Sequence, residues 1–383
     1  MRILILESVS GLRRRIDPGL FPEGFAMLRT MVDEFSEAGF DVITVLNRKL
    51  KSLAGWLDAH VLFKQDGFGE VLRCKPDASL IIAPEKGREL EQITAKLRKK
   101  GVDVLGAREG AIRASADKWL TYLALKGKVP QPKTWRKPPN IRGQILTKPA
   151  DGVGCEGIKL FTLSSKKIEG MVFQEFLKGE HASCCLLMGK GRGIALSVNR
   201  QEIVTKGGGF EYLGGEIPLN HKSEKKCAEI ALSAAKALNL RGYCGVDLIV
   251  GDIPYFIELN PRVTTSFIAL AQVLQANLGK LLVDVIVEGN SPPKPKLRGH
   301  SLMRIPRARS DVKVDIKKLG ELREIPGVIA PPFSSDGNLM EGSPMFMAAG
   351  SGGSVKAARS RLVDTIEEAL AHLEVDGSAI AWP

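Results

Sequence analysis

The stretch IELNPRVTTSF, residues 257–267, ends a run of apolar residues with three polar side chains at alternate positions. Alternate side chains of a β-strand point to one face, so the groups of Glu258, Asn260 and Arg262 would gather there. Carboxylate and amide oxygens suit Mg²⁺, and a guanidinium can hold a phosphate or stabilise a developing oxyanion. An acidic surface hairpin followed by a chance Asn-Pro turn is the alternative interpretation.

A second strand brings another carboxylate to this set. The segment GVDLIVGDIPYFIELN predicts a β-hairpin with a two-residue turn at Gly251–Asp252, which places Asp247 opposite Phe256. Cross-strand partners share a face, so Asp247 would lie beside Glu258 and Asn260. The sequence therefore predicts a magnesium site made of these three residues and completed by phosphate oxygens and water.

A glycine-rich segment, LTKPADGVGCEG at 146–157, has the composition of a phosphate-binding loop. Lys148 ends a predicted strand, and Gly152, Gly154 and Gly157 follow it. Glycines let backbone N–H groups approach phosphate oxygens, and the lysine adds a positive charge. No GK[ST] follows the glycines, so this is not a Walker loop, and a plain glycine-rich hairpin is the alternative.

The segment FQEFLKGEHAS, residues 173–183, could hold the nucleoside part of a nucleotide. A strand end at Glu175, Phe176 and Leu177 can offer backbone groups to an adenine ring. The carboxylate of Glu180 can accept hydrogen bonds from the two ribose hydroxyls. The alternative is that Glu180 is a solvated acid of a loop.

Two further stretches could recognise a substrate. In SVNRQEIVTKGGGFEYLGGEIPL, residues 197–219, Arg200 and Gln201 end a strand before a glycine-rich, mobile loop, and Arg200 could bind a carboxylate. A long exposed hairpin tip is the alternative. Three hydroxyl residues stand at a predicted helix start. The favoured interpretation is that they cap the helix, and the alternative is that they bind an anion. They are Thr264, Thr265 and Ser266.

The elements that position these residues fall into two patterns. Strands alternate with helices in the first part of the chain, which predicts a parallel α/β sheet covered on both faces. After about residue 115 the strands are short and several are joined by glycine turns, which favours a mainly antiparallel α+β arrangement. The segment SPPKPKLRG, residues 291–299, is typical of a stiff linker and is followed by short strands and one good helix.

Composition and charge narrow the function classes. The 383 residues carry a net charge of +12, but no aromatic residues interleave with the basic ones, so nucleic-acid binding is disfavoured. No run of about 18 apolar residues occurs, which argues against a membrane span. The start MRILILESVSGLRRR reverses the order of a secretory signal and predicts a cytoplasmic protein. The six cysteines form no CxxC pair, so neither a zinc site nor a disulfide framework is indicated.

The order of the motifs resembles the ATP-grasp superfamily over about residues 1–290. The matching motifs are a lysine in a helix start (ASADKWL), an entry strand with prolines (VPQPKTW), the lysine strand with its glycine loop, the hinge QEFLKGE, and VDLIV…FIELNPR. The resemblance implies an N-terminal α/β domain at 1–112, an ATP-grasp domain of two subdomains at 113–290, and a linker with a small α+β extension at 291–383.

The resemblance also implies roles for the site residues. Lys118 joins Lys148 in contacting the ATP phosphates, and Arg262 stabilises an acyl phosphate and the tetrahedral states that follow it. The metal would be Mg²⁺ or Mn²⁺. Many relatives have glutamate where Asp247 stands, so this residue departs from the usual pattern.

The chemistry implied is ligation of a carboxylate to an amine. The carboxylate attacks the γ-phosphate of ATP, and an amine then expels phosphate from the acyl phosphate. The segments NRQ…GG…P, ELNPRVTTS and EGFAMLRTMVDEF are similar to the tyramine–glutamate ligases of methanofuran biosynthesis, which use the γ-carboxylate of glutamate. Such an enzyme would bind a small acid and a small amine, no nucleic acid and no membrane, and would form a homodimer. Other amino-acid or peptide ligases, a biotin-dependent carboxylase subunit and a non-catalytic or regulatory ATP-binding protein are the alternatives.

Overall fold

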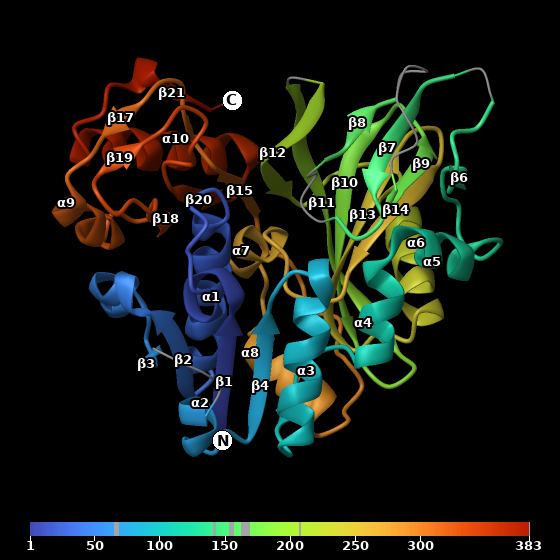
Figure 1. The fold of residues 1–383 in the computed structure, drawn as a ribbon, viewed down its shortest axis with the longest axis horizontal. Coiled ribbons are helices and arrows are strands. Elements are labelled where there is room, and N and C mark those ends of the chain that lie inside the picture. The colour runs from blue at the N-terminus through green and yellow to red at the C-terminus, as the bar shows by residue number, and fades with distance from the viewer. Residues whose placement is uncertain (65–68, 141–142, 153–156, 162–168, 207, 383) are drawn as a thin grey trace.

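The computed structural model describes residues 1–382 except 65–68, 141–142, 153–156, 162–168 and 207. The described residues form three sheets of four or more strands, of which the one near the N-terminus is parallel, and two two-stranded sheets, β16-β21 and β17-β19 (Figure 1). A search of the described residues finds no helix with the length and apolar character that a membrane span requires.

The first sheet is five-stranded and parallel, with strand order β3-β2-β1-β4-β5. Its strands are β1 (Arg2–Glu7), β2 (Asp41–Asn47), β3 (His60–Lys64), β4 (Ala78–Ile82) and β5 (Asp103–Val104). The accompanying helical segments are η1 (Ser8–Leu12), α1 (Phe21–Glu37), η2 (Arg48–Trp56), α2 (Gly69–Arg73), η3 (Lys86–Arg88) and α3 (Glu89–Lys99). Ile3 and Ile5 of β1 belong to the core under α1, whereas Leu4 and Leu6 belong to the core under α3. Both faces of β1 are therefore covered, as its continuous apolar run predicts.

A small antiparallel sheet follows, with strand order β6-β9-β7-β8. Its strands are β6 (Thr134–Trp135), β7 (Ile145–Pro149), β8 (Lys159–Leu160) and β9 (Met171–Glu175). Two helices precede it, α4 (Glu109–Ala116) and α5 (Lys118–Leu125). This sheet carries the predicted lysine strand, β7, and the predicted hinge follows β9.

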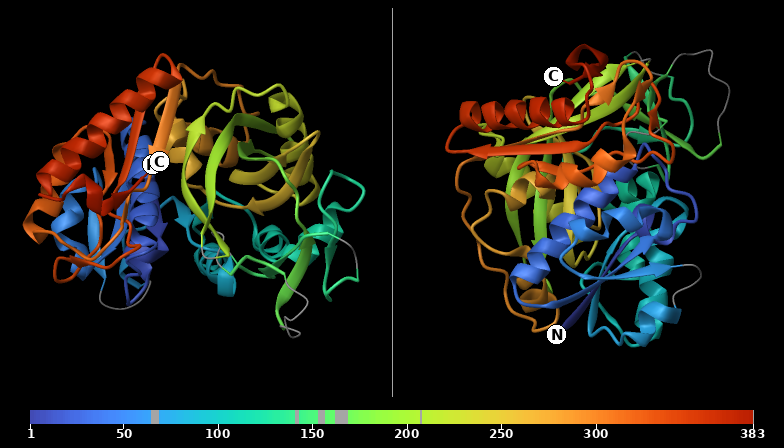
Figure 2. Two further views of the ribbon diagram at one scale, coloured as in Figure 1. Left: turned by 90° about the horizontal axis from the view of Figure 1, so that it is seen from above. Right: turned by 90° about the vertical axis from the view of Figure 1, so that its left-hand side faces the viewer.

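The largest sheet has eight strands in the order β14-β13-β10-β11-β12-β15-β20-β18. These are β10 (Glu180–Met188), β11 (Gly193–Lys206), β12 (Gly209–Ile217), β13 (Gly242–Val250), β14 (Pro254–Asn260), β15 (His300–Arg304), β18 (Val328–Ala330) and β20 (Met347–Gly352). Its helices are α6 (Glu224–Ala237), α7 (Ser266–Ala271), α8 (Leu278–Ile286) and α10 (Val355–His372). In Figure 2 the red α10 lies at one end of the molecule and the yellow strands of the β13–β14 hairpin lie toward the other.

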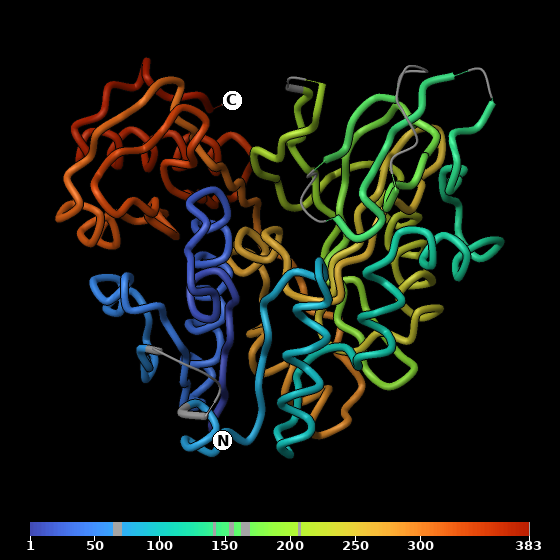
Figure 3. Tube along the Cα trace, in the orientation of Figure 1, coloured from blue at the N-terminus to red at the C-terminus, as the bar shows by residue number. Residues whose placement is uncertain are grey.

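The chain after residue 290 continues this large sheet. The segment 291–299 has the composition of a linker, yet Gln275 N donates to Lys296 O at 2.8 Å and Arg298 N donates to Val273 O at 2.8 Å. Figure 3 shows the trace passing from α8 up to β15, which pairs with β12. The domain limits at 112 and 290 stay a prediction, although strand pairing crosses the second of them.

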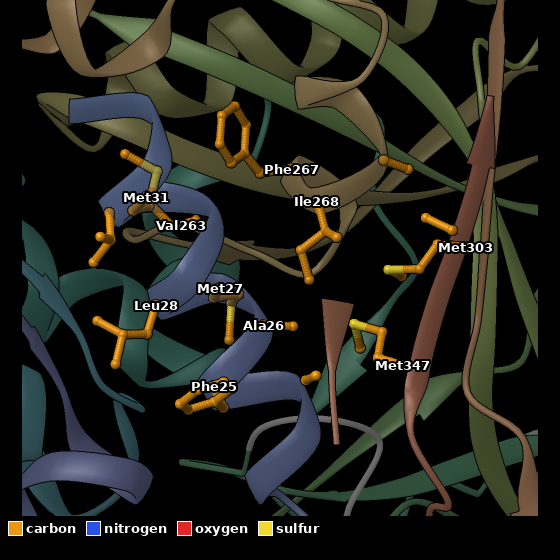
Figure 4. Packing of buried hydrophobic residues seen from close by; sticks show 14 of the residues in the cluster. Phe25, Ala26, Met27, Leu28, Met31, Val263, Phe267, Ile268, Met303 and Met347 are labelled. Carbon is orange, nitrogen blue, oxygen red and sulfur yellow. The ribbon is translucent and has the colours of Figure 1, made fainter. Parts of the chain in front are cut away.

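The C-terminal part completes its fold with short elements. They are β16 (Arg307–Ala308), β17 (Val312–Lys313), α9 (Ile316–Glu321), η4 (Leu322–Glu324), β19 (Asn338–Leu339), η5 (Gly377–Ala379) and β21 (Ile380–Ala381). Figure 4 shows Ala26 and Met27 of α1 in the same core as Ile268 of α7, Met303 of β15 and Met347 of β20. One core thus joins the first helix of the chain to its last strands.

The predicted register of the β13–β14 hairpin is wrong, although the face that it assigns is correct. The structure places Asp247 opposite Glu258, not Phe256, and pairs Gly245 with Asn260. One residue of the shift comes from a three-residue connection, because Val250 pairs with Pro254, and one from an irregularity after Asp247. A shift of one residue would turn the side chains to the opposite face, whereas a total of two restores it.

The predicted glycine-rich loop after Gln201 is also wrong, because most of it is strand β12. Gly214 adopts a φ of 146° within this strand, and a Cβ there would lie 1.9 Å from Met303 O of β15. The glycine therefore serves the close approach of a neighbouring strand. Glycine composition alone does not distinguish this use from a loop.

Candidate active site

A cleft of about 290 Å³ lies where the three larger sheets meet. The first sheet contributes residues at the carboxyl ends of β1 and β4, the edge of an open α/β sheet where ligands usually bind. Most of the sequence-predicted site residues line this cleft. They are Lys148, Glu175, Phe176, Leu177, Gln201, Asp247, Glu258, Asn260, Arg262, Thr264, Thr265 and Ser266.

Two carboxylates face each other on adjacent strands of the hairpin. Asp247 Oδ1 accepts a hydrogen bond from Gln201 Nε2 at 2.9 Å, and Asp247 Oδ2 accepts one from Asn260 Nδ2 at 3.3 Å. Burial and the charge of Glu258 together raise the pKa of Asp247 to about 7, against the lowering effect of the two amides. The site therefore holds concentrated negative charge that a cation would stabilise.

These residues fit a magnesium ion bound with a nucleotide. Within the described part of the chain, no group of three or more His, Cys, Asp or Glu is arranged to hold a metal. Two carboxylates and an amide oxygen are nevertheless sufficient for Mg²⁺, which keeps several waters and takes substrate phosphates into its shell. The amide of Asn260 would turn its oxygen toward the ion, because its nitrogen is the atom that now contacts Asp247.

Lys118 connects the small sheet's lysine and glycine segment to the hairpin. It begins α5, where the Asp117 side chain accepts hydrogen bonds from Trp119 N and Leu120 N and fixes the helix start. Lys118 Nζ lies 3.0 Å from Glu258 Oε1 and 2.5 Å from the Gly152 carbonyl oxygen. Its ammonium group therefore lies at the edge of the acidic pair, where a phosphate could replace one of its present partners.

The opposite side of the cleft is suited to an adenine ring. Residues 175–177 run from the last residue of β9 and line the cleft together with the apolar side chains of Leu146, Ile158 and Leu248. Lys148 lies in β7 with only 5% of its surface exposed. The burial of His181 lowers the pKa of that histidine, and the charge of Lys148 lowers it further. A buried ammonium beside this apolar region is a suitable partner for the phosphates of a nucleotide.

Arg262 is held by an acid that the sequence analysis missed. Arg262 Nε lies 3.2 Å from Glu85 Oε1, and both side chains are largely buried. Burial raises the pKa of Glu85, while Arg262 lowers it. Glu85 follows β4, and Glu7 ends the adjacent strand β1. Their positions at the carboxyl ends of predicted parallel strands are the signal by which the sequence could have indicated them as site residues.

The favoured capping role of the three hydroxyl residues is wrong. Helix α7 does begin at Ser266 as predicted, but no described backbone N–H is capped by the Thr265 hydroxyl. The Thr264 hydroxyl lies 3.2 Å from the Tyr243 hydroxyl, and Ser266 Oγ lies 3.1 Å from Ser183 Oγ. The hydroxyls thus bond to neighbouring strands because the helix begins against the sheet, where these partners lie closer than its own N–H groups.

Other predicted residues do not reach the cleft lining. Glu180 and Arg200 form an ion pair with each other at 2.5 Å, across strands β10 and β11. Gly157 adopts a φ of 71°, and Gly154 lies outside the described residues. Among residues not predicted, the cleft is also lined by Glu23, Met27, His181, Phe210 and Tyr212.

The chain is similar to known proteins both in sequence and in fold. The model of the ATP-grasp domain family matches residues 115–266. Tyramine–L-glutamate ligase of Methanocaldococcus fervens is 34% identical over 280 residues, which cover 70% of this chain and 88% of that protein. The crystal structure of an ATP-grasp superfamily protein from Archaeoglobus fulgidus has a TM-score of 0.66 at 25% identity, covering 90% of this chain and 99% of that chain.

The fold recurs in a more distant enzyme. The biotin carboxylase domain of the 2-oxoglutarate carboxylase of Hydrogenobacter thermophilus, solved with MgADP, ADP and bicarbonate, has a TM-score of 0.72. Its identity is 14%, and the match covers 96% of this chain and 89% of that chain. At this identity the likeness shows the fold alone, including the fold of the C-terminal part.

The chain belongs to the ATP-grasp superfamily, and the predicted ATP-grasp fold with its parallel N-terminal sheet is confirmed. Within the superfamily it is a carboxylate–amine ligase, an enzyme that forms C–N bonds and resembles the tyramine–glutamate ligases.

Proposed function

We propose that the enzyme joins the γ-carboxylate of glutamate to the amine of tyramine, with ATP and Mg²⁺, through an acyl phosphate. The observation that carries this proposal is the 34% identity to tyramine–L-glutamate ligase over 88% of that protein. Support for it also comes from the acidic pair, from Lys148 and Arg262, which line one cleft with that pair, and from Lys118, which pairs with Glu258. A role in the biosynthesis of a methanofuran-type cofactor is part of the same proposal.

The residues of the chain bind and position the reactants. Lys118 and Lys148 hold the ATP phosphates. Phosphate binding by Gly152, Gly154 and Gly157 stays a prediction, because residues 153–156 lie outside the described part of the chain. Residues 175–177 flank the adenine ring. Asp247, Glu258 and Asn260 would hold the magnesium ion, which would neutralise charge on the phosphates. Ribose binding by Glu180 and carboxylate binding by Arg200 stay predictions, and both require their mutual ion pair to open.

The two chemical steps need no covalent catalyst from the protein. A carboxylate oxygen of glutamate attacks the γ-phosphorus, and the bond to the β-γ bridging oxygen breaks to release ADP. The amine nitrogen then attacks the acyl carbon, the C–O bond to phosphate breaks, and the nitrogen loses a proton. Arg262, fixed by Glu85, stabilises the negative oxygens of both steps. Catalysis thus rests on positioning and charge stabilisation.

The proposal is tested by ADP release over a matrix of acids and amines with MgATP. We expect release that requires glutamate and tyramine together, and an amide product of the corresponding mass. Release with a different acid or amine would replace the proposed substrates by another ligase pair. Release that depends on bicarbonate and biotin, or none with any pair despite ATP binding, would refute the proposal.

A further inference from the structure

The wall of the cleft formed by α1 and β12 has no part in the ATP chemistry proposed above. Glu23 and Met27 project from successive turns of α1, and Phe210 and Tyr212 are alternate residues of β12, so each pair lies on one face of its element. All four line the cleft. They join one carboxylate to an otherwise apolar and aromatic surface.

Glu23 is a carboxylate without a close partner. It forms no hydrogen bond or ion pair with another described residue, and burial raises its pKa against the lowering influence of Arg307 and Arg262. Those two guanidinium groups already have partners, because Arg262 pairs with Glu85 at 3.2 Å and Arg307 pairs with Glu211 at 2.8 Å. A ligand ammonium would supply Glu23 with the hydrogen-bond donor that the chain does not.

The surface beside Glu23 is suited to an aromatic ring. Met27 is 7% exposed, and Phe210 and Tyr212 are each half-buried. The Tyr212 hydroxyl is buried and lies near the Thr265 hydroxyl. Glu23 and Tyr212 line the same cleft, and the charge of this carboxylate raises the pKa of the phenol. Apolar area and aromatic edges stabilise a bound ring, and a phenolic group could pair with the Tyr212 hydroxyl.

The C-terminal part of the chain holds this surface in place. Arg307 lies in β16, and Glu211, its partner, lies between Phe210 and Tyr212 in β12. The guanidinium of Arg307 also donates to Gly342 O at 3.1 Å, which ties it to its own segment. The segment that begins at residue 291 therefore supports the aromatic side of the wall.

We propose that Glu23, Met27, Phe210 and Tyr212 form the amine subsite, which takes an arylalkyl ammonium with its charge on Glu23 and its ring against the other three. This inference rests on the proposed ligase function and deepens it. Glu23 and Arg262, the arginine that would hold the acyl phosphate, both line the cleft. An amine with its charge on Glu23 would therefore have its nitrogen in the same cleft as the acyl carbon that it attacks.

The test begins with direct binding, which does not depend on turnover. Tyramine and butylamine are titrated calorimetrically into the full-length protein with MgADP, for the wild type, Glu23→Gln and Phe210→Ala. We expect tyramine to bind about 10- to 100-fold more weakly to Glu23→Gln, because a hydrogen bond to a charged group is lost. We expect about a tenfold loss for Phe210→Ala with tyramine and a smaller one with butylamine, which has no ring. Glu37→Gln, an exposed acid of the same helix, and Val204→Ala, exposed on β11, are the matched controls.

A second measurement separates this subsite from the ligase chemistry. Hydroxylamine, which has no ring, attacks an acyl phosphate and yields a hydroxamate and phosphate. We expect Glu23→Gln and Phe210→Ala to lower kcat/KM for tyramine about tenfold or more relative to kcat/KM for hydroxylamine. An equal loss with both amines, or unchanged tyramine affinity in Glu23→Gln, would overturn the subsite. Wild-type protein that binds tyramine through these residues but forms no hydroxamate from glutamate would support the subsite and refute the proposed acid.

Discussion

The two walls of the cleft are built from different lengths of chain. One wall is the β13–β14 hairpin, which brings Asp247, Glu258 and Asn260 together from a single continuous segment. The other wall combines α1 with β12, which lie far apart in the sequence and meet only through the shared core. A hairpin carries its own pairing geometry, whereas the second wall exists only once the tertiary fold has formed. Substitutions in the two walls should therefore fail in different ways.

The largest effect is expected in the hairpin wall. Glu258→Gln should lower turnover about 1,000-fold, because the change removes a charge from the proposed metal site and the partner of Lys118. Turnover is measured as ADP release with saturating glutamate and tyramine, and folding by a thermal melt. Glu288→Gln, an exposed acid after α8, is the control. Near-normal turnover in a folded Glu258→Gln protein would remove Glu258 from the metal site.

The next effect concerns the buried lysine that faces the hairpin. Lys148→Ala should lower kcat/KM for ATP about 100-fold, since its charge would contact phosphates in the transition state. Lys159→Ala, exposed on the neighbouring strand β8, provides a matched loss of one positive charge. Equal kinetics for the two variants would show that the net charge of the small sheet matters rather than the position of Lys148.

The second wall should be sensitive to pH through its packing. Glu34 of α1 accepts a hydrogen bond from Leu278 N at 2.5 Å, and burial raises its pKa to about 7. The Glu34 carboxyl thus keeps its proton to a higher pH in the native state than in the unfolded chain. The stability that it contributes is therefore complete below about pH 4.5 and is lost as the pH rises through about 7. The loss should be on the order of 2–3 kcal/mol.

Glu34→Gln isolates this contribution from those of other buried acids. The amide keeps an oxygen for Leu278 N but does not ionise, so the variant should lose about 2–3 kcal/mol less stability than the wild type between pH 5 and pH 8. The free energy of unfolding is measured with urea at both pH values, with Glu37→Gln as the control. The same pH dependence of the free energy of unfolding in the wild type and in Glu34→Gln would contradict a raised pKa of the buried Glu34 carboxyl.

The hairpin wall could be predicted from sequence because its information is local. Alternation within β14 assigned Glu258 and Asn260 to one face, and the turn residues assigned the partner strand. The register was wrong by two residues, but the face of Asp247 was correct because side chains repeat with a period of two. The helix predicted after the linker, α10, was equally accessible, since apolar spacing predicts a helix wherever it occurs.

The second wall could not be predicted, because its signals are ambiguous without tertiary contacts. Gly214 and its neighbours indicate a loop by composition, yet their small size serves the approach of β15. Phe210 and Tyr212 then appear as loop residues rather than as alternate positions of a strand. Glu23 lies in the first turn of α1, where an acid is favoured by the helix dipole alone. Nothing in the sequence connects it to β12.

The smallest effect is expected at the bridge between the N-terminal sheet and the hairpin wall. Glu85→Gln leaves an amide beside Arg262 and weakens the restraint on its guanidinium, so kcat should fall about tenfold while KM for ATP changes little. The matched control is Glu89→Gln, because the native Glu89 also pairs with an arginine, Arg13, at 2.9 Å. If Arg262 acts through its position on the acyl phosphate, Arg262→Lys should lower kcat by at least as large a factor as Glu85→Gln does. The double variant should then lower kcat by less than the product of the two factors. Multiplicative losses would mean that Glu85 stabilises the sheet edge without positioning Arg262.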